Sequence, residues 1–198
     1  AVDGRYRAFT LPLRHYFSEY AFYKYRAQVE IEHLIALSEF FEDKVVRPLS
    51  GEEKKSLRAL YQNFSWHEAY EILQYDHLGR EGVGPTEHDC KSVELWIKEK
   101  IIKTTGFDII PSLHIFLTSE DVRNLALKTM LAEATNDIFV PAVYKICDQL
   151  KDLANKYASD PVMGRTHLQP ASPTTFGKIF ANYLSRLTDG LERLDQVA

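Results

Sequence analysis

The chain has 198 residues, of which 45% are hydrophobic and 26% charged, and its formal net charge is −4. This length suits one sizeable domain or two small ones, and the composition is that of a globular rather than a disordered chain. The absence of a long basic run argues against a nucleic-acid-binding surface. No apolar run is long enough to span a bilayer, so no membrane partner is expected.

The two cysteines, Cys90 and Cys147, show no CxxC spacing. That usage argues against a disulfide framework and against a zinc site, and small buried thiols are the simplest interpretation. The sequence also begins without a signal-peptide pattern. Together these features predict a cytoplasmic protein.

Hydrophobic periodicity predicts helices through the first half of the chain. The first covers residues 13–40, with an apolar stripe that includes Tyr20, Tyr25 and Leu34. Two capping-box patterns, Ser50-x-x-Glu53 and Ser65-x-x-Glu68, predict the starts of two more helices. Residues 79–85 contain three glycines and a proline, which predict a loop.

The same reasoning predicts three helices in the second half. Thr86-x-x-Asp89 is expected to cap a helix that carries His88 in its first turn, and Thr118 to Asp121 open a long helix that reaches about Tyr157. Pro141 lies inside this long helix and predicts one kinked rod. The last helix begins near residue 174, and its apolar residues recur every three or four positions to form a seam that needs partner helices. Because no strand alternation of useful length occurs, the predicted class is all-α.

The segment Gly164-Arg-Thr-His-Leu-Gln-Pro-Ala-Ser-Pro173 is polar and lies between two of these helices. Two prolines restrict its backbone, and its one histidine, His167, has a side chain suited to proton transfer near neutral pH. Rigidly held loops often display catalytic groups. Composition alone nevertheless favours the alternative, an ordinary turn with a hydrogen-bonded surface histidine.

Four motifs that match a known family in the same order along the chain favour the catalytic interpretation of this segment over the ordinary turn. Thr166-His167-x-Gln169-Pro170-Ala171, with Ser172 to Lys178 after it, resembles the histidine signature of the adenylosuccinate lyase family, within the fumarase/aspartase superfamily. Residues 2–6 resemble the family's substrate-phosphate segment, Glu87 to Glu94 its second histidine segment, and Thr118 to Asp121 its carboxylate-binding helix start. The resemblance runs from residue 2 to the end of the chain.

The resemblance implies a fold, a reaction and an assembly. The fold would be a small helical domain over residues 1–105, followed by the first part of a long-helix bundle over residues 106–198. The reaction would be β-elimination of fumarate from adenylosuccinate and from its imidazole carboxamide precursor (SAICAR) in purine synthesis, with no metal or organic cofactor. Family members form homotetramers whose active sites combine motifs from three subunits.

The resemblance also implies residue roles. His167 would be the general acid that protonates the leaving nitrogen, with Thr166 and Gln169 contacting the substrate beside it. His88 would contact substrate phosphate or assist His167, flanked by Glu87 and Asp89. The alternative is that His88 pairs with Asp89 or another carboxylate.

Two further pairs complete the expected substrate contacts. Thr118 and Ser119 would bind a carboxylate at a helix start, although they could equally cap their own helix. Arg5 and Tyr6 would contact the nucleotide phosphate, which suits the planar guanidinium of arginine, although a mobile tail is the alternative.

The sequence departs from the family pattern at three points. Nothing resembles the mobile serine loop that supplies the family's base, so we expect this loop beyond Ala198 and expect the chain to be inactive by itself. Leu168 stands where relatives often carry glycine and would be strained if that position needs a positive φ. Glu87 replaces an asparagine or arginine. The rival functions are a lyase that acts on argininosuccinate or a simpler dicarboxylate, and a helical scaffold without chemistry.

Overall fold

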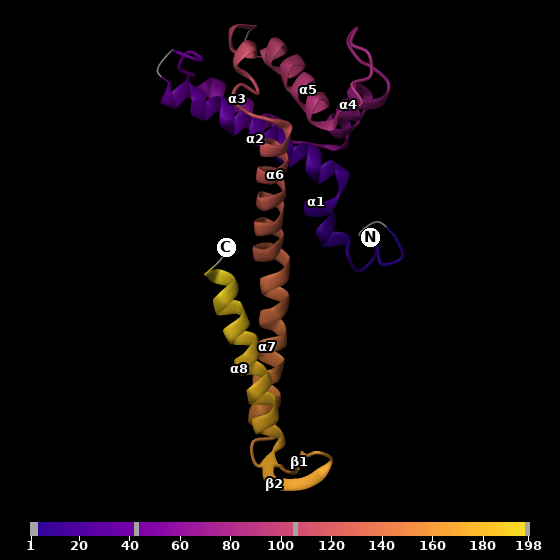
Figure 1. Ribbon diagram of the computed structural model, residues 1–198, viewed down its shortest axis with the longest axis vertical. Helices are drawn as coiled ribbons and strands as arrows, with labels where there is room; N and C mark the ends of the chain where they lie inside the picture. The colour runs from indigo at the N-terminus through magenta and orange to yellow at the C-terminus, as the bar shows by residue number, and fades with distance from the viewer. Residues whose placement is uncertain (1–3, 42–43, 105–106, 197–198) are drawn as a thin grey trace. The chain divides into compact units, whose positions relative to one another are not determined.

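The computed structural model describes residues 4–41, 44–104 and 107–196, which form helices and one two-stranded β-hairpin (Figure 1). The mainly helical class predicted from the sequence is therefore confirmed. The chain divides into two compact units, residues 1–131 and 132–198. The division falls inside helix α6, Ser119–Ala134. The domain boundary expected near residue 105 stays a prediction.

The first unit contains helices joined by turns and loops. They are η1 (Leu11–Leu13), α1 (Arg14–Phe17), α2 (Glu19–Phe40), α3 (Gly51–Gln62), α4 (Trp66–His77), α5 (Asp89–Thr104), the 3₁₀ segment η2 (Phe107–Ser112) and the start of α6. Among the described residues, no helix of the chain is long and apolar enough to cross a membrane.

The single helix predicted over residues 13–40 is wrong at one point. Ser18 has extended backbone angles, so α1 ends at Phe17 and α2 begins at Glu19. The hydroxyl of Ser18 accepts a hydrogen bond from the backbone N–H of Ala21 at 3.2 Å, which caps α2. Serine favours such caps because its short side chain satisfies a backbone donor that the first helical turn leaves free.

Helix α2 forms the centre of the first unit. Its buried residues do not follow one stripe but surround the helix, since α3, α4 and α5 pack around it. Leu57 from α3, Ile72 from α4 and Trp96 from α5 are all fully buried in the same core. Burying each side chain of this size contributes roughly 1.5–3 kcal/mol relative to leaving it exposed.

An ion network ties α4 to α5 beside this core. The Arg80 guanidinium donates to Glu71 Oε1 at 2.8 Å and to Glu99 Oε2 at 2.9 Å, and both carboxylates are buried. The indole N–H of Trp96 donates to the second oxygen of Glu71 at 2.9 Å. A buried carboxylate without partners is unfavourable, so these hydrogen bonds and ion pairs offset the cost of burying Glu71 and Glu99 beside the core.

Two of the predicted capping boxes are confirmed, and a third prediction is wrong. Ser50 and Ser65 each cap a helix in the predicted way. Thr86, however, is not the cap of the next helix, because α5 begins only at Asp89. His88 precedes the first helical residue, and its ring nitrogen Nδ1 accepts the backbone N–H of Lys91 at 3.3 Å. An imidazole thus takes the role predicted for the threonine.

The second unit contains the end of α6, the π-helical turn η3 (Thr135–Phe139), α7 (Val140–Lys156), the strands β1 (Pro161–Thr166) and β2 (Gln169–Thr175), and α8 (Phe176–Asp195). Residues 119–156 are helical throughout, as predicted. The π-turn ends at Phe139, two residues before Pro141, which is in the first turn of α7. A wider turn suits this position because the proline ring removes a donor and crowds the preceding helical turn.

The hairpin is the feature of the second unit that the sequence analysis missed. Strands β1 and β2 are antiparallel, and Thr166 pairs with Gln169 next to the turn. Proline at positions 161, 170 and 173 suggested a loop, but a two-stranded ribbon tolerates proline because each strand has an unpaired edge. The absence of strands predicted from the sequence is therefore wrong for these residues.

Helices α7 and α8 lie side by side (Figure 1). Thr175 caps α8 by accepting the N–H of Lys178 at 3.1 Å, one residue later than the predicted start. Gly177 is buried where α8 meets the end of α7, and a Cβ there would lie 2.5 Å from the carbonyl oxygen of Ala154. The apolar seam predicted along α8 is partly covered by α7, with Tyr157 and Phe180 in ring contact at 6.2 Å.

Candidate active site

His88 is held in a defined orientation at the start of α5. Its Nδ1 accepts the N–H of Lys91, and its own backbone N–H donates to the hydroxyl of Thr86 at 3.2 Å. Because Nδ1 is an acceptor, the ring proton of the neutral imidazole is assigned to Nε2. About half of the side chain is exposed. The Nε2 edge is therefore the edge available to a ligand.

Ser119 lies opposite that edge. Its hydroxyl oxygen is 3.5 Å from Nε2 of His88, although the two residues are 31 positions apart. Two of the motifs predicted to form the site thus meet within the first unit. Ser119 is the first residue of α6, where free backbone N–H groups and the positive end of the helix dipole favour an anion.

Thr118, in contrast, is occupied by its own helix. Its hydroxyl donates to Asp121 Oδ2 at 2.5 Å, and its backbone N–H donates to the same oxygen at 2.8 Å. The structure therefore favours the capping alternative for Thr118. Its backbone still sets the position of Ser119.

Asp89 and Glu87 flank His88 and differ in how they are held. Asp89 Oδ2 forms an ion pair with Arg26 at 2.6 Å, and the Arg26 side chain is only 3% exposed. Asp89 Oδ1 lies 3.9 Å from Nδ1 of His88, too far for a hydrogen bond, so the predicted alternative of a histidine committed to Asp89 is not favoured. Glu87 is exposed and has a φ of +49°, a conformation that is uncommon for this residue type.

His88 lines two hollows. One, of about 540 Å³, is lined by Asp76, His77, Glu87, His88 and Asp89. The other, of about 370 Å³, is lined by Thr86, His88, Cys90, Lys91, Glu94, His114 and Ser119. The second brings together groups that donate protons, accept protons and carry positive charge, which is the composition expected of a site for a polar metabolite.

His114 is the residue at this site that the sequence analysis missed. The sequence indicated no role for it, yet it lines the second hollow, and its Nδ1 lies 2.6 Å from Oε1 of Glu30. Glu30 is fully buried in α2. Burial raises the pKa of the Glu30 carboxyl, while the hydrogen bond from His114 opposes that rise. No spacing in the sequence links these two residues, which are 84 positions apart.

His167 occupies the tip of the β-hairpin in the second unit. It and Leu168 form the two-residue turn, with φ angles of +47° and +67°. Positive φ at both central residues is typical of a type I′ turn, where asparagine and glycine are preferred. The strain expected at Leu168 is therefore present. Both side chains are exposed, and the paired Thr166 and Gln169 hold the turn from either side.

Arg5 and Tyr6 lie in an exposed turn before η1. The guanidinium of Arg5 lies 5.8 Å from the centre of the Tyr6 ring. Neither residue lines the two hollows beside His88. Residues 2 and 3 of the predicted phosphate segment lie outside the described residues. The structure thus brings His88 and Ser119 together within one unit, and it leaves the phosphate role of Arg5 and Tyr6 a prediction.

Comparison with known proteins identifies the relatives of the chain. It is 36% identical to adenylosuccinate lyase of Dictyostelium discoideum over 98% of this chain and 41% of that protein. It is 35% identical to adenylosuccinate lyase of Escherichia coli K12 over 99% of this chain and 42% of that protein. The chain therefore spans about two fifths of the length of these relatives.

Solved structures show the same fold. A fumarate lyase from Mesorhizobium sp. BNC1 superposes with a TM-score of 0.70 at 18% identity, over 94% of this chain and 39% of that one. The 3-carboxy-cis,cis-muconate lactonizing enzyme of Pseudomonas putida superposes with a TM-score of 0.63 at 22% identity, over 94% and 38%. The lyase family matches residues 4–198. The chain belongs to the lyase family.

Proposed function

We propose that this chain is part of a cytoplasmic, homotetrameric adenylosuccinate lyase, which eliminates fumarate from adenylosuccinate and from SAICAR. The observation that carries the proposal is the meeting of His88 and Ser119 at one hollow, at a distance of 3.5 Å. The identity of 35–36% to adenylosuccinate lyases over nearly the whole chain supports the choice of substrate.

The proposed reaction needs an acid, a base and a site for a developing negative charge. A base removes a proton from the carbon next to a carboxylate, charge builds on that carboxylate, and an acid protonates the departing nitrogen. His167 is our candidate for the acid because its imidazole is exposed on a short, strained turn between two paired strands. Such a turn fixes the position of the backbone that carries the ring, and acid catalysis requires a positioned proton donor.

Ser119 and the start of α6 are our candidates for the carboxylate site. The hydroxyl and the free N–H groups of the first turn supply hydrogen bonds that strengthen as charge develops. His88 lies beside them with Nε2 directed at the same point. It supplies a further donor to the substrate, either to phosphate or in a relay to His167.

The resemblance implies a catalytic base that is a serine on a mobile loop, and nothing in this sequence resembles that loop. We therefore propose that turnover requires the complete protein and that these 198 residues alone are inactive. An assay of the isolated chain for loss of adenylosuccinate absorbance tests this. Turnover near that of a complete lyase would show that the base lies within the chain.

The substrate assay with the complete protein tests the function itself. Adenylosuccinate and SAICAR should each yield stoichiometric fumarate, whereas argininosuccinate should yield none. Fumarate from argininosuccinate alone would favour the rival lyase. A folded protein that binds AMP but cleaves none of the three would favour a scaffold that kept the fold and lost the chemistry.

A further inference from the structure

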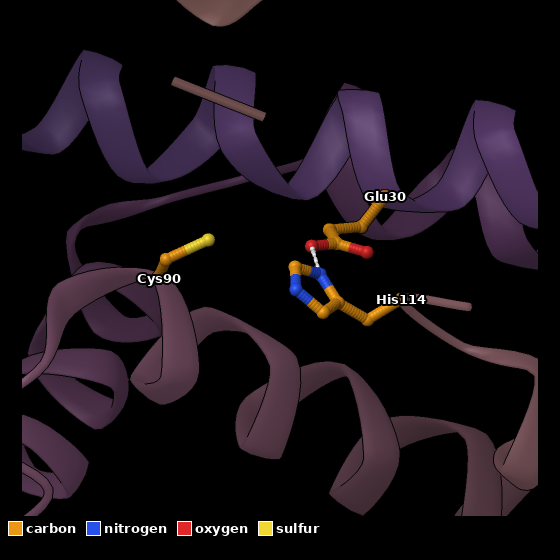
Figure 2. A group of neighbouring side chains, drawn as sticks. All are labelled: Glu30, Cys90 and His114. Atoms are coloured by element: carbon orange, nitrogen blue, oxygen red, sulfur yellow. Dashed lines mark hydrogen bonds and ion pairs between the residues drawn. The ribbon is translucent and has the colours of Figure 1, made fainter. Parts of the chain in front are cut away.

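Three side chains from distant parts of the sequence converge under the hollow that contains His88. Glu30 comes from α2, Cys90 from α5 and His114 from the segment before α6 (Figure 2). One ligand atom from each lies within 4.8 Å of the other two. Cys90 Sγ points toward the pair formed by Glu30 and His114 (Figure 2). Carboxylate, thiol and imidazole are the three ligand types that Zn²⁺ accepts.

The Glu30 carboxylate is incompletely satisfied. It is fully buried, Oε1 bonds to His114, and Oε2 has no hydrogen-bond partner among the described residues. A buried polar atom without a partner costs roughly 1–3 kcal/mol, and more when the group is charged. Such an atom would be stabilised by a cation or a water. Figure 2 shows this second oxygen on the side of the carboxylate away from Cys90, so the carboxylate turns when both of its oxygens approach an ion beside the thiol.

From this geometry we propose that Glu30, Cys90 and His114 bind one thiophilic divalent cation, Zn²⁺ being the best match. The thiolate favours Zn²⁺ over Mg²⁺ and Ca²⁺, which prefer oxygen ligands. One thiolate, one carboxylate and one neutral imidazole carry two negative charges, which the ion neutralises. Binding forms S–Zn, O–Zn and N–Zn bonds, the thiol proton is released to solvent, and the Nδ1 proton of His114 is lost from Nδ1 as Nε2 becomes the protonated nitrogen of the neutral ring.

The ligand positions need only small shifts. Zinc ligands lie about 2.0–2.3 Å from the ion, which places them roughly 3.5 Å apart in a tetrahedral site. The three atoms are already within 4.8 Å of one another, and the His114 and Glu30 atoms are 2.6 Å apart. The ion therefore replaces the hydrogen bond between His114 and Glu30 and draws Cys90 inward.

The fourth position faces the hollow. Cys90 and His114 both line it, together with Ser119 and His88. Burial raises the pKa of the Cys90 thiol to about 11, so the thiol is protonated until a metal displaces the proton. Three protein ligands and one open position are typical of zinc sites that exchange water or a small ligand. The ion would lie next to the proposed substrate site.

Cobalt provides a probe that does not depend on turnover. Co²⁺ added to the complete, reduced protein should give one bound ion per chain and a near-ultraviolet thiolate-to-cobalt charge-transfer band, which Zn²⁺ removes by competition. Cys90→Ser should abolish the band, while Cys147→Ser, a buried cysteine in α7, should retain it. Circular dichroism checks that each variant is folded.

Glu30→Gln provides the second variant, because it keeps the size of the side chain and removes its charge. Loss of a ligand should weaken Co²⁺ binding by at least the roughly 10–100-fold that loss of an outer-shell partner costs. The proposal is overturned if the wild-type protein gives no charge-transfer band, if the band survives in Cys90→Ser, or if Glu30→Gln binds Co²⁺ as tightly as the wild type. Because the readout is a spectrum, its failure is distinguishable from failure of the proposed lyase function.

Discussion

Nε2 of His88 and the hydroxyl oxygen of Ser119 lie 3.5 Å apart at the edge of one hollow. Each residue stands at the beginning of a helix, His88 just before α5 and Ser119 as the first residue of α6. At α5 the first-turn N–H groups of Cys90 and Lys91 already bond to Asp89 and His88. The start of α6, with the positive end of its helix dipole, is therefore the part of this space that favours a ligand with negative charge.

Ser119→Ala tests the role of this hydroxyl in the complete protein. A lost hydrogen bond to a charged group costs roughly 1.5–3 kcal/mol, so kcat/KM for adenylosuccinate should fall by about 10–100-fold. Ser56→Ala, at an exposed position of α3, is the matched control and should leave kcat/KM unchanged. Equal kcat/KM values for the two variants would remove Ser119 from the substrate site.

Gly177 should be intolerant of any side chain. Because its Cβ would meet the carbonyl oxygen of Ala154 at 2.5 Å and the Cα of Ala158 at 2.6 Å, Gly177→Ala should destabilise the protein by roughly 1–3 kcal/mol. Gly190 lies in the same helix with open space around it, so Gly190→Ala should stabilise by about 0.5–1 kcal/mol. Thermal unfolding of the two variants measures this contrast. Equal shifts in Tm would contradict the observed packing of α8 against α7.

The positive φ at Leu168 predicts how the stability of the protein depends on the residue at this position. A φ of +67° is unfavourable for any residue with a Cβ and most unfavourable for a β-branched one. Leu168→Val should therefore lower stability by about 1 kcal/mol, the lower end of the range for backbone strain. Leu168→Gly should be neutral or slightly stabilising, since relief of strain is offset by the greater freedom of glycine in the unfolded chain. A valine variant as stable as the wild type would mean that the turn does not have this conformation.

Glu99 should give the stability of the first unit a defined pH dependence. The Arg80 guanidinium, together with Lys103 and Tyr75, lowers the pKa of Glu99 to about 2, against about 4.3 in an unfolded chain. A lowered folded-state pKa means that this stabilisation is present above about pH 5 and is lost as the pH falls toward 2. Glu99→Gln should therefore cost roughly 1–3 kcal/mol at pH 7 and progressively less below pH 4.

Urea unfolding at pH 7 and at pH 3 measures this dependence. Glu52→Gln, at an exposed position in the first turn of α3, is the control and should lose at pH 7 only the roughly 0.3–1 kcal/mol that a surface charge contributes at a helix start. If the difference between Glu99→Gln and the wild type were the same at the two pH values, the ion network would not stabilise the fold in this way.

The features that the sequence predicted well are those set by local chemistry. The capping boxes at Ser50 and Ser65 formed because each needs only residues three positions apart. The cap by His88 was not predictable by the same rule, since an imidazole replaced the expected hydroxyl. The break at Ser18 was missed because the apolar periodicity continues across it.

Long-range features were predictable only in part. The motifs around His88 and Ser119 were each recognised, but their contact depends on how α5 and α6 pack. The pairing of His114 with Glu30 leaves no pattern in the sequence, because burial rather than spacing selects it. The hairpin was missed for two reasons. Its prolines are uncommon in strands and indicated a loop. The pairing of Thr166 with Gln169 also depends on a turn with positive φ angles, which leucine rarely adopts.

The most direct test of the account is the turnover of adenylosuccinate by the complete protein carrying His167→Ala. Removal of a general acid should lower kcat by roughly 10²–10⁴-fold. KM should change little, and the exposed His15→Ala control should retain full activity. Turnover by His167→Ala equal to that of the control would contradict the proposal that this imidazole protonates the leaving nitrogen.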